Sequence, residues 1–299
     1  MISAWVILTL MAALLVSTAS ILEKKTLFLQ HAMEFITVLS ICTAVLTMPL
    51  FFLADTSSLT PGVIGLSFIA ALIGGMAALF CAKALRHIAI SLSSPFLAFT
   101  PLATLIIAVL FLGEKVTGLQ AVGIVVLMGG AYLLESHSHD NILEPFRHFF
   151  KSKHIRYMLI AVLLYGISSV LDKKVLGAHA DGGLGVSALA YLPLNQFFQA
   201  IILIVMMLIF HDGFKGVEQG IRQSWKPVLL VGFLLVWSRL AYTFALSLPG
   251  VLVSLLIPIK RLGVIFTTFF GGEIFHEKEV IKRSLACVVM LIGAVLILI

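Results

Sequence analysis

Charged residues are scarce in this sequence, which excludes a water-soluble fold. Asp, Glu, Lys and Arg together make up 11% of the 299 residues, whereas 61% are hydrophobic and the mean hydropathy is +1.13. Soluble domains contain about 45–50% apolar and about 25% charged residues. The net charge of +6 does not indicate nucleic-acid binding, because the basic residues flank apolar segments, as they do in the loops of membrane proteins. The composition therefore indicates an integral membrane protein.

Cysteines and catalytic motifs are equally sparse. Cys42, Cys81 and Cys287 lie within apolar segments and have no CxxC spacing, which excludes a disulfide framework and a zinc site. The sequence "HSHD" at 137–140 stands alone, so no metal site is predicted. HExxH, GxSxG and the phosphate-binding loop are missing. We therefore predict neither an enzyme nor a bound cofactor, and the missing phosphate-binding loop argues against ATP hydrolysis by this chain.

The sequence does contain a series of long apolar stretches. A helix that crosses a bilayer needs about 17–25 apolar residues, and lengths of about 20 favour helices over the shorter strands of a barrel. We therefore expect an all-α integral membrane protein that crosses the lipid bilayer of the cell (plasma or inner) membrane many times. Ten transmembrane helices are predicted, at 3–22, 35–53, 61–82, 89–112, 117–134, 155–171, 186–210, 227–248, 250–272 and 280–299.

The two halves of the chain resemble each other. "ASILEKKTL" at 19–27 matches "SSVLDKKVL" at 168–176, and "SLSSP" at 91–95 matches "SLLIP" at 254–258. A polar stretch separates the halves, so we predict a first repeat at 1–134, a linker at 135–154 and a second repeat at 155–299. Because each repeat holds five spans, the second enters the membrane in the opposite orientation. Inverted repeats of this kind commonly enclose a substrate site near the middle of the membrane.

The order of these features resembles a known family. The two inverted five-helix repeats, the Pro-containing fourth and ninth spans, and the "LGEK" and "HEK" ends are similar to EamA-type members of the drug/metabolite transporter superfamily. The resemblance extends over nearly the whole chain and implies a secondary transporter of small metabolites that works by alternating access. Small multidrug relatives exchange protons for cationic drugs through a Glu in the first helix. Residues 5–22 contain no acid, so a cationic-drug antiporter is disfavoured.

Two adjacent cations, Lys260 and Arg261, interrupt the apolar stretch 251–272. A charge near the centre of a span costs about 2.5–3.5 kcal/mol and usually faces a cavity or a partner. Helical spacing places both on the polar side of the ninth span, and Arg239 on a similar side of the eighth. The pair resembles the Lys-Arg pair with which plastid phosphate translocators of the same superfamily hold the substrate phosphate.

No acidic residue lies in the middle of a predicted span. The interior cations are therefore predicted to lack a buried protein partner and to bind an anionic ligand, a carboxylate or a phosphate. The predicted substrate-binding residues are Lys260, Arg261, Arg239, Asn195, Gln196, Gln199 and Tyr242.

Residues at the ends of the spans have two interpretations. The lysines of the matching "EKK" and "DKK" sequences are expected to be interfacial anchors, and the acids of "LGEK" and "HEK" are expected to be helix caps or salt-bridge partners. Gating is the alternative for both groups, which are Lys24, Lys25, Lys173, Lys174, Glu114 and Glu277. Pro95, Pro101 and Pro258 are candidate hinges because they free backbone carbonyls. Gly74, Gly75, Gly123, Gly129, Gly130 and Gly293 are expected to permit close helix packing.

Alternatives to anion transport remain. One is a non-transporting membrane protein whose cations lie at headgroup depth and bind anionic lipid or a partner. Another is an exporter of amino acids or other neutral metabolites. The sequence leaves a homodimer open, and it leaves the orientation open as well. The loops that follow odd-numbered spans carry thirteen Lys and Arg against three on the other side, which places both termini outside, whereas the resemblance implies that both lie inside.

Overall fold

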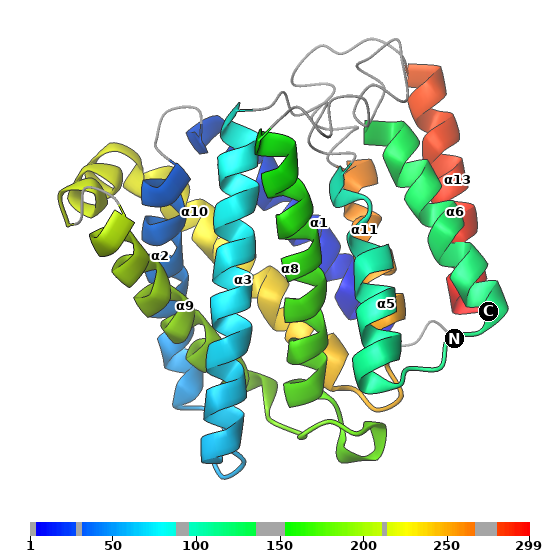
Figure 1. Ribbon diagram of the computed structural model, residues 1–299, viewed down its shortest axis with the longest axis horizontal. Coiled ribbons are helices and arrows are strands. Elements are labelled where there is room, and N and C mark those ends of the chain that lie inside the picture. Colours follow the sequence, from blue (N-terminus) through cyan, green and yellow to red (C-terminus); the bar gives the residue numbers. More distant parts are fainter. Residues whose placement is uncertain (1–3, 28–31, 88–95, 136–152, 211–213, 267–279) are drawn as a thin grey trace.

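The chain folds into a bundle of helices, as Figure 1 shows. The computed structural model describes residues 4–27, 32–87, 96–135, 153–210, 214–266 and 280–299, and within this part every regular element is helical. The helices are α1 (Ala4–Leu27), α2 (Ala32–Phe51), α3 (Pro61–His87), α5 (Thr100–Leu112), α6 (Gly118–Glu135), α8 (Lys153–Leu176), α9 (Ala188–Phe210), α10 (Phe214–Ser247), α11 (Val253–Arg261) and α13 (Val280–Leu298). A short 3-10 helix, η1 (His179–Asp181), lies between α8 and α9.

The predicted all-α membrane class is confirmed. In the described part of the chain, six helices are long and apolar enough to cross a bilayer: α1, α2, α3, α8, α9 and α10. Shorter apolar helices lie at Thr100–Leu112, Gly118–Leu134 and Leu285–Leu298. Every predicted span overlaps a helix, and the count of ten crossings stays a prediction.

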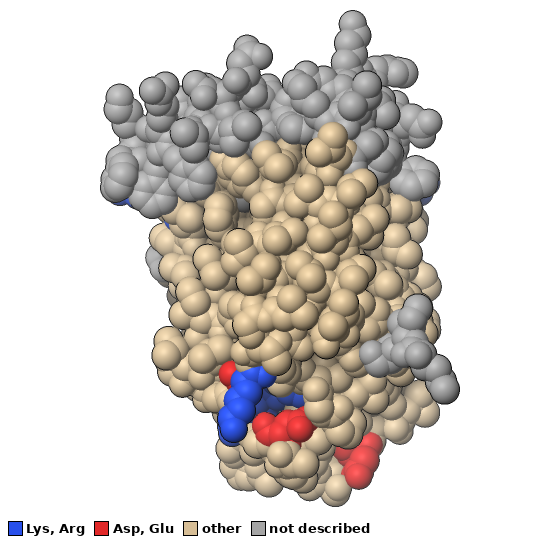
Figure 2. All heavy atoms as spheres, turned by 90° about the vertical axis from the view of Figure 1, so that its right-hand side faces the viewer, with Lys and Arg blue, Asp and Glu red and all other residues tan. Residues whose placement is uncertain are grey.

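The outer surface has the character expected of a face in contact with lipid. Val122 and Val125 on α6 and Val288, Leu291 and Val295 on α13 are exposed. Figure 2 shows this side of the molecule as a surface nearly free of acidic and basic side chains, which gather at its lower end. Hydrocarbon offers no hydrogen bonds, so helices that satisfy their own backbone are the stable elements beneath such a surface.

The most extensive helix contacts in the described part join the two halves of the sequence. α1 packs against α10 and α3 against α8, while α2 packs against α9 and α6 against α13. The repeat relates α1 to α8 and α3 to α10. The contact of α1 with α10 therefore has its repeat counterpart in the contact of α8 with α3. Each half therefore forms its core with the other.

Glycines allow the closest of these contacts. A Cβ at Gly123 would lie 2.8 Å from the backbone oxygen of Gly293, and one at Gly130 would lie 2.8 Å from the Met290 nitrogen. Gly74 and Gly75 likewise face Ser168 and Gln199. The prediction of close packing is confirmed at these positions. It is wrong for Gly129, which has nothing within 4 Å of its Cβ position and is exposed.

Two helices are interrupted at positions that the sequence repeat relates to each other. A turn at residues 98–99 precedes α5, and a turn at Leu262 separates α11 from the helical residues 263–266. Pro101 lies in the first turn of α5, and Pro258 lies inside α11. Beyond the second break, Ser17 Oγ of α1 donates to the Gly263 oxygen over 2.8 Å. Pro95 lies outside the described residues.

Candidate functional site

A chain of hydrogen bonds connects α8, α9 and α10 inside the bundle. Tyr191 Oη donates to Asp172 Oδ1 over 2.5 Å, and Asn195 Nδ2 donates to Tyr191 Oη over 3.2 Å. Arg239 Nη1 completes the chain by donating to Asn195 Oδ1 over 3.4 Å. Asp172, Tyr191 and Asn195 are buried, and Arg239 is half-buried. Tyr191 and Asn195 share one face of α9 because they are four residues apart.

Lys260 joins this cluster from α11. Its Nζ lies 4.4 Å from the centre of the Tyr242 ring, a geometry in which the ring face attracts the ammonium. The Tyr242 hydroxyl lies beside Asp172 and Ser169. Among the described residues, neither this hydroxyl nor Gln196 Oε1 makes a hydrogen bond of normal geometry, although both atoms are buried. Buried polar atoms of this kind are usually satisfied by a ligand or by ordered water.

The two cations of the cluster lie several residues from the nearby ends of their helices. At a rise of about 1.5 Å per residue, Arg239 is about 12 Å from the end of α10 at Ser247 and Lys260 is about 10 Å from the start of α11 at Val253. A hydrocarbon core about 30 Å thick with its edge at these helix ends would hold both cations near its middle third. The lipid-binding alternative predicts cations at headgroup depth, and this placement disfavours it.

The prediction that the interior cations lack a buried protein partner is wrong for two of them. Arg239 and Lys260 both interact electrostatically with Asp172, which is buried although it belongs to the last turn of α8. Neither cation forms a direct ion pair with it within the described part of the chain, where the ion pair found is that of Lys173 with Asp181. Sequence reasoning missed this because it judged depth by position along one helix, whereas neighbouring helices cover Asp172.

Arg261 points toward a second group of side chains nearer the other end of the bundle. Arg261 and Glu23 both interact electrostatically with Cys81, which also contacts Tyr165. Arg261 and Glu23 are half-buried and Cys81 is buried. Glu23 and Asp172 occupy matching positions of the "EKK" and "DKK" sequences. Each repeat therefore brings its acid close to interior polar groups.

The remaining amides of the predicted site lie on α9. Gln196 is buried next to Asn195, and Gln199 is half-buried. The Gln199 side chain packs against α3, with its Cγ 3.5 Å from the position of a Cβ at Gly75. The structure therefore brings Asn195, Arg239, Tyr242 and Lys260 together and places Gln199 at the contact with α3.

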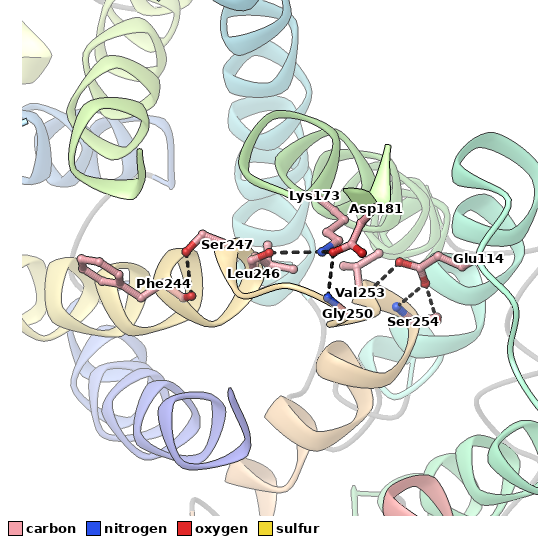
Figure 3. A network of polar contacts seen from close by, with 9 residues as sticks. All are labelled: Glu114, Lys173, Asp181, Phe244, Leu246, Ser247, Gly250, Val253 and Ser254. Atoms are coloured by element: carbon pink, nitrogen blue, oxygen red, sulfur yellow. Dashed lines mark hydrogen bonds and ion pairs between the residues drawn. The ribbon is translucent and has the colours of Figure 1, made fainter. Parts of the chain in front are cut away.

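Glu114 caps a helix of the other half (Figure 3). It follows α5, and its carboxylate accepts hydrogen bonds from the backbone nitrogens of Val253 over 2.8 Å and Ser254 over 3.1 Å, and from Ser254 Oγ. These are free donors of the first turn of α11, where the helix dipole also favours an acid. The interpretation as a cap is confirmed for Glu114, with α11 as its partner, while Glu277 lies outside the described residues.

Lys173 stabilises the same end of the bundle. Its Nζ donates to the Leu246 oxygen over 3.3 Å and lies 3.6 Å from Asp181 Oδ2, which accepts from the Gly250 nitrogen over 2.8 Å (Figure 3). Lys173 is buried, so the interpretation as an interfacial anchor is wrong for it. Lys174 is exposed and donates to the Gly182 oxygen over 2.7 Å. The side chains of Lys24 and Lys25 are not among the described ones.

Sequence reasoning left Asp172, Asp181 and Ser254 out of the site. The signal for Asp172 was present, since the repeat places an acid before two lysines in both halves. Asp181 and Ser254 gave no such signal, because their roles depend on loops that meet only in the fold. The described residues contain no group of three or more His, Cys, Asp and Glu that could hold a metal ion.

Comparison with known proteins gives a fold for the whole chain and a family similarity for its first half. One solved crystal structure has a TM-score of 0.74 with this chain at 13% sequence identity, and the match covers 99% of this chain and 97% of that one. At this identity the similarity shows the fold alone. The search of curated proteins found no match. Residues 3–136 match the model of the EamA-like transporter family, so the first half of this multi-pass membrane protein is similar to that family.

Proposed function

We propose that the protein is a secondary transporter that carries a small anionic metabolite by alternating access. The substrate binds between α9, α10 and α11, where Arg239 and Lys260 supply positive charge. The observation that carries the proposal is that, among the described residues, both cations lie near Asp172 without a direct ion pair to it, beside the buried hydroxyl of Tyr242, which makes no hydrogen bond of normal geometry. A carboxylate or phosphate would accept charge-assisted hydrogen bonds from both cations.

The charge balance of the interior supports an anion. Apart from Lys173, which pairs with Asp181, its described basic side chains are Arg239, Lys260 and Arg261, and Asp172 and Glu23 are the acids near them. One positive charge remains. A buried charge without a counter-ion is strongly unfavourable, so this excess of positive charge favours an anion over a cation as the substrate.

The arrangement of the helices supports alternating access. The two helix breaks lie at positions related by the repeat, and Lys260 and Arg261 directly precede the second one. Binding sites of inverted-repeat transporters are typically formed by such interrupted helices. The pairing of α1 with α10 and of α3 with α8 is the pairing that an inverted repeat of five helices would produce.

Counterflow in proteoliposomes tests the proposal. We suggest radiolabelled gluconate, malate, glycerol 3-phosphate, alanine and a cationic dye as probes. We expect at least one anion to exchange, and we expect Lys260→Gln and Arg239→Gln each to slow that exchange at least tenfold. Lys115→Gln is the matched control because Lys115 is an exposed cation in the loop after α5. Exchange of the dye alone, unaffected by either substitution, would refute an anion site.

An amino acid is the second candidate substrate, because Asp172 places a carboxylate beside the two cations. Such a site would bind the ammonium group as well as the carboxylate of a zwitterion. Exchange of alanine with none of the three anions would favour this candidate.

A further inference from the structure

Asp172 is placed to compete with an anionic substrate. It is buried, it accepts a hydrogen bond from Tyr191, and the cations that interact with it electrostatically are the two assigned to the substrate. When no substrate is bound, its negative charge offsets theirs. An anion that binds Arg239 and Lys260 takes over this role and leaves Asp172 beside a like charge in a region of low dielectric constant. Two neighbouring carboxylates rarely both remain ionised under such conditions.

Resting on the proposed function, we propose that Asp172 is an internal counter-ion that takes up one proton when the anionic substrate binds, so that the protein couples anion transport to protons. The carboxylate gains the proton from water on the open side of the membrane and forms an O–H bond. When the substrate leaves on the other side, Arg239 and Lys260 again stabilise the ionised form and the proton is released. One proton therefore crosses with each anion.

The surroundings of Asp172 suit both protonation states. α9 contributes Tyr191, which donates to it, and α11 contributes Lys260. α10 contributes Arg239 and Tyr242, whose hydroxyl lies nearby and can accept a hydrogen bond from the protonated acid.

The other described titratable groups on the helices around Asp172 are bound elsewhere or lie far from it. On its own helix the next residue, Lys173, is bound to Leu246 and Asp181. α5 has no titratable side chain between Thr100 and Leu112, and the titratable groups described on α3, Cys81 and Lys83, lie toward its far end. Asp172 is therefore the acid within this cluster.

Uptake driven by a pH gradient tests the proposal. Proteoliposomes at internal pH 8.5 are diluted into medium at pH 7.5 with labelled gluconate, malate or glycerol 3-phosphate, while valinomycin and equal potassium hold the membrane potential at zero. One proton per anion gives about tenfold accumulation for this gradient of one pH unit. We expect wild type to approach this value and Asp172→Asn, which cannot ionise, to equilibrate the anion without accumulating it.

The matched control is Asp55→Asn, since Asp55 is an exposed acid that bonds only locally to Ser57. We expect it to accumulate the anion as wild type does. Wild-type counterflow of an anion without any response to the pH gradient would overturn the proton coupling and leave the proposed function intact. No counterflow of any anion would instead refute the proposed function. Accumulation by Asp172→Asn at the wild-type level would show that the proton binds elsewhere.

Tyr191→Phe provides a second route if Asp172→Asn does not fold. Loss of the hydroxyl removes a hydrogen bond that favours the ionised carboxylate. The acid then keeps its proton to higher pH, so we expect the external pH of half-maximal uptake to rise. A pH profile identical to wild type would contradict a role for Asp172.

Discussion

At the scale of single residues, Glu114 shows how one side chain connects the halves. Its two oxygens satisfy three donors at the start of α11, while Glu114 itself follows α5 in the other half. Loss of a helix cap costs about 0.5–2 kcal/mol, and the helix dipole adds to this for a charged cap. The residue holds α11, which carries Lys260, against the end of α5.

We therefore expect Glu114→Ala to lower the free energy of unfolding by about 1–2 kcal/mol. The measurement is an SDS titration in mixed micelles, followed by tryptophan fluorescence. Lys115→Ala is the control, because Lys115 is the next residue, is exposed and lies in the same loop. Equal stability of the two variants would mean that the bonds of Glu114 to Val253 and Ser254 contribute nothing measurable.

At the scale of elements, α6 and α13 pack so closely that glycines of one helix lie against the backbone of the other. A Cβ at Gly130 would lie 2.7 Å from Met290 Cγ and 2.8 Å from the Met290 nitrogen, whereas one at Gly129 would meet nothing within 4 Å. Adjacent glycines on one helix therefore have opposite environments. This contrast allows the packing to be separated from helix propensity, which is the same for both positions.

We expect Gly130→Ala to destabilise the protein by about 1–3 kcal/mol, because backbone atoms of α13 must move to admit the methyl group. Gly129→Ala should be neutral or stabilising by up to about 1 kcal/mol, because alanine is the better helix former. Both are measured by the same SDS titration. A Gly130→Ala variant as stable as Gly129→Ala would disprove close contact of α6 with α13.

The apolar pattern of the sequence predicted the elements better than their interactions. Long apolar stretches form helices in a membrane because the backbone groups must hydrogen-bond within the segment. The positions of α2, α3, α6 and α9 therefore followed from composition alone. The packing partners of those helices could not be predicted in this way, because apolar composition does not specify which two helix surfaces pack together. The cations of the site were found because a charge is conspicuous in an apolar stretch. Asp172 was missed because its burial depends on neighbouring helices.

At the scale of the whole molecule, the fold sorts the loops onto two sides. The connections at 52–60, 113–117, 177–187 and 248–252 lie toward the lower side of Figure 1, as do the labelled N and C ends. This side carries three of the sixteen loop cations counted along the sequence, Lys115, Lys173 and Lys174. Of these, Lys173 is buried against Leu246, which lowers the basic charge that this side presents to water.

The excess of basic residues on the opposite side predicts that it faces the cytoplasm, with both termini outside the cell. Single cysteines test this once Cys42, Cys81 and Cys287 are replaced by serine. Ser57 and Lys115 are exposed on the lower side, and Lys226 is exposed toward the opposite end of α10. We expect a membrane-impermeant maleimide to label Ser57→Cys and Lys115→Cys in intact cells, and to label Lys226→Cys only after lysis. The reverse pattern would place both termini inside, as the resemblance to EamA-type transporters implies. It would also mean that cations such as Lys24 and Lys25 line the transport path and do not determine the orientation.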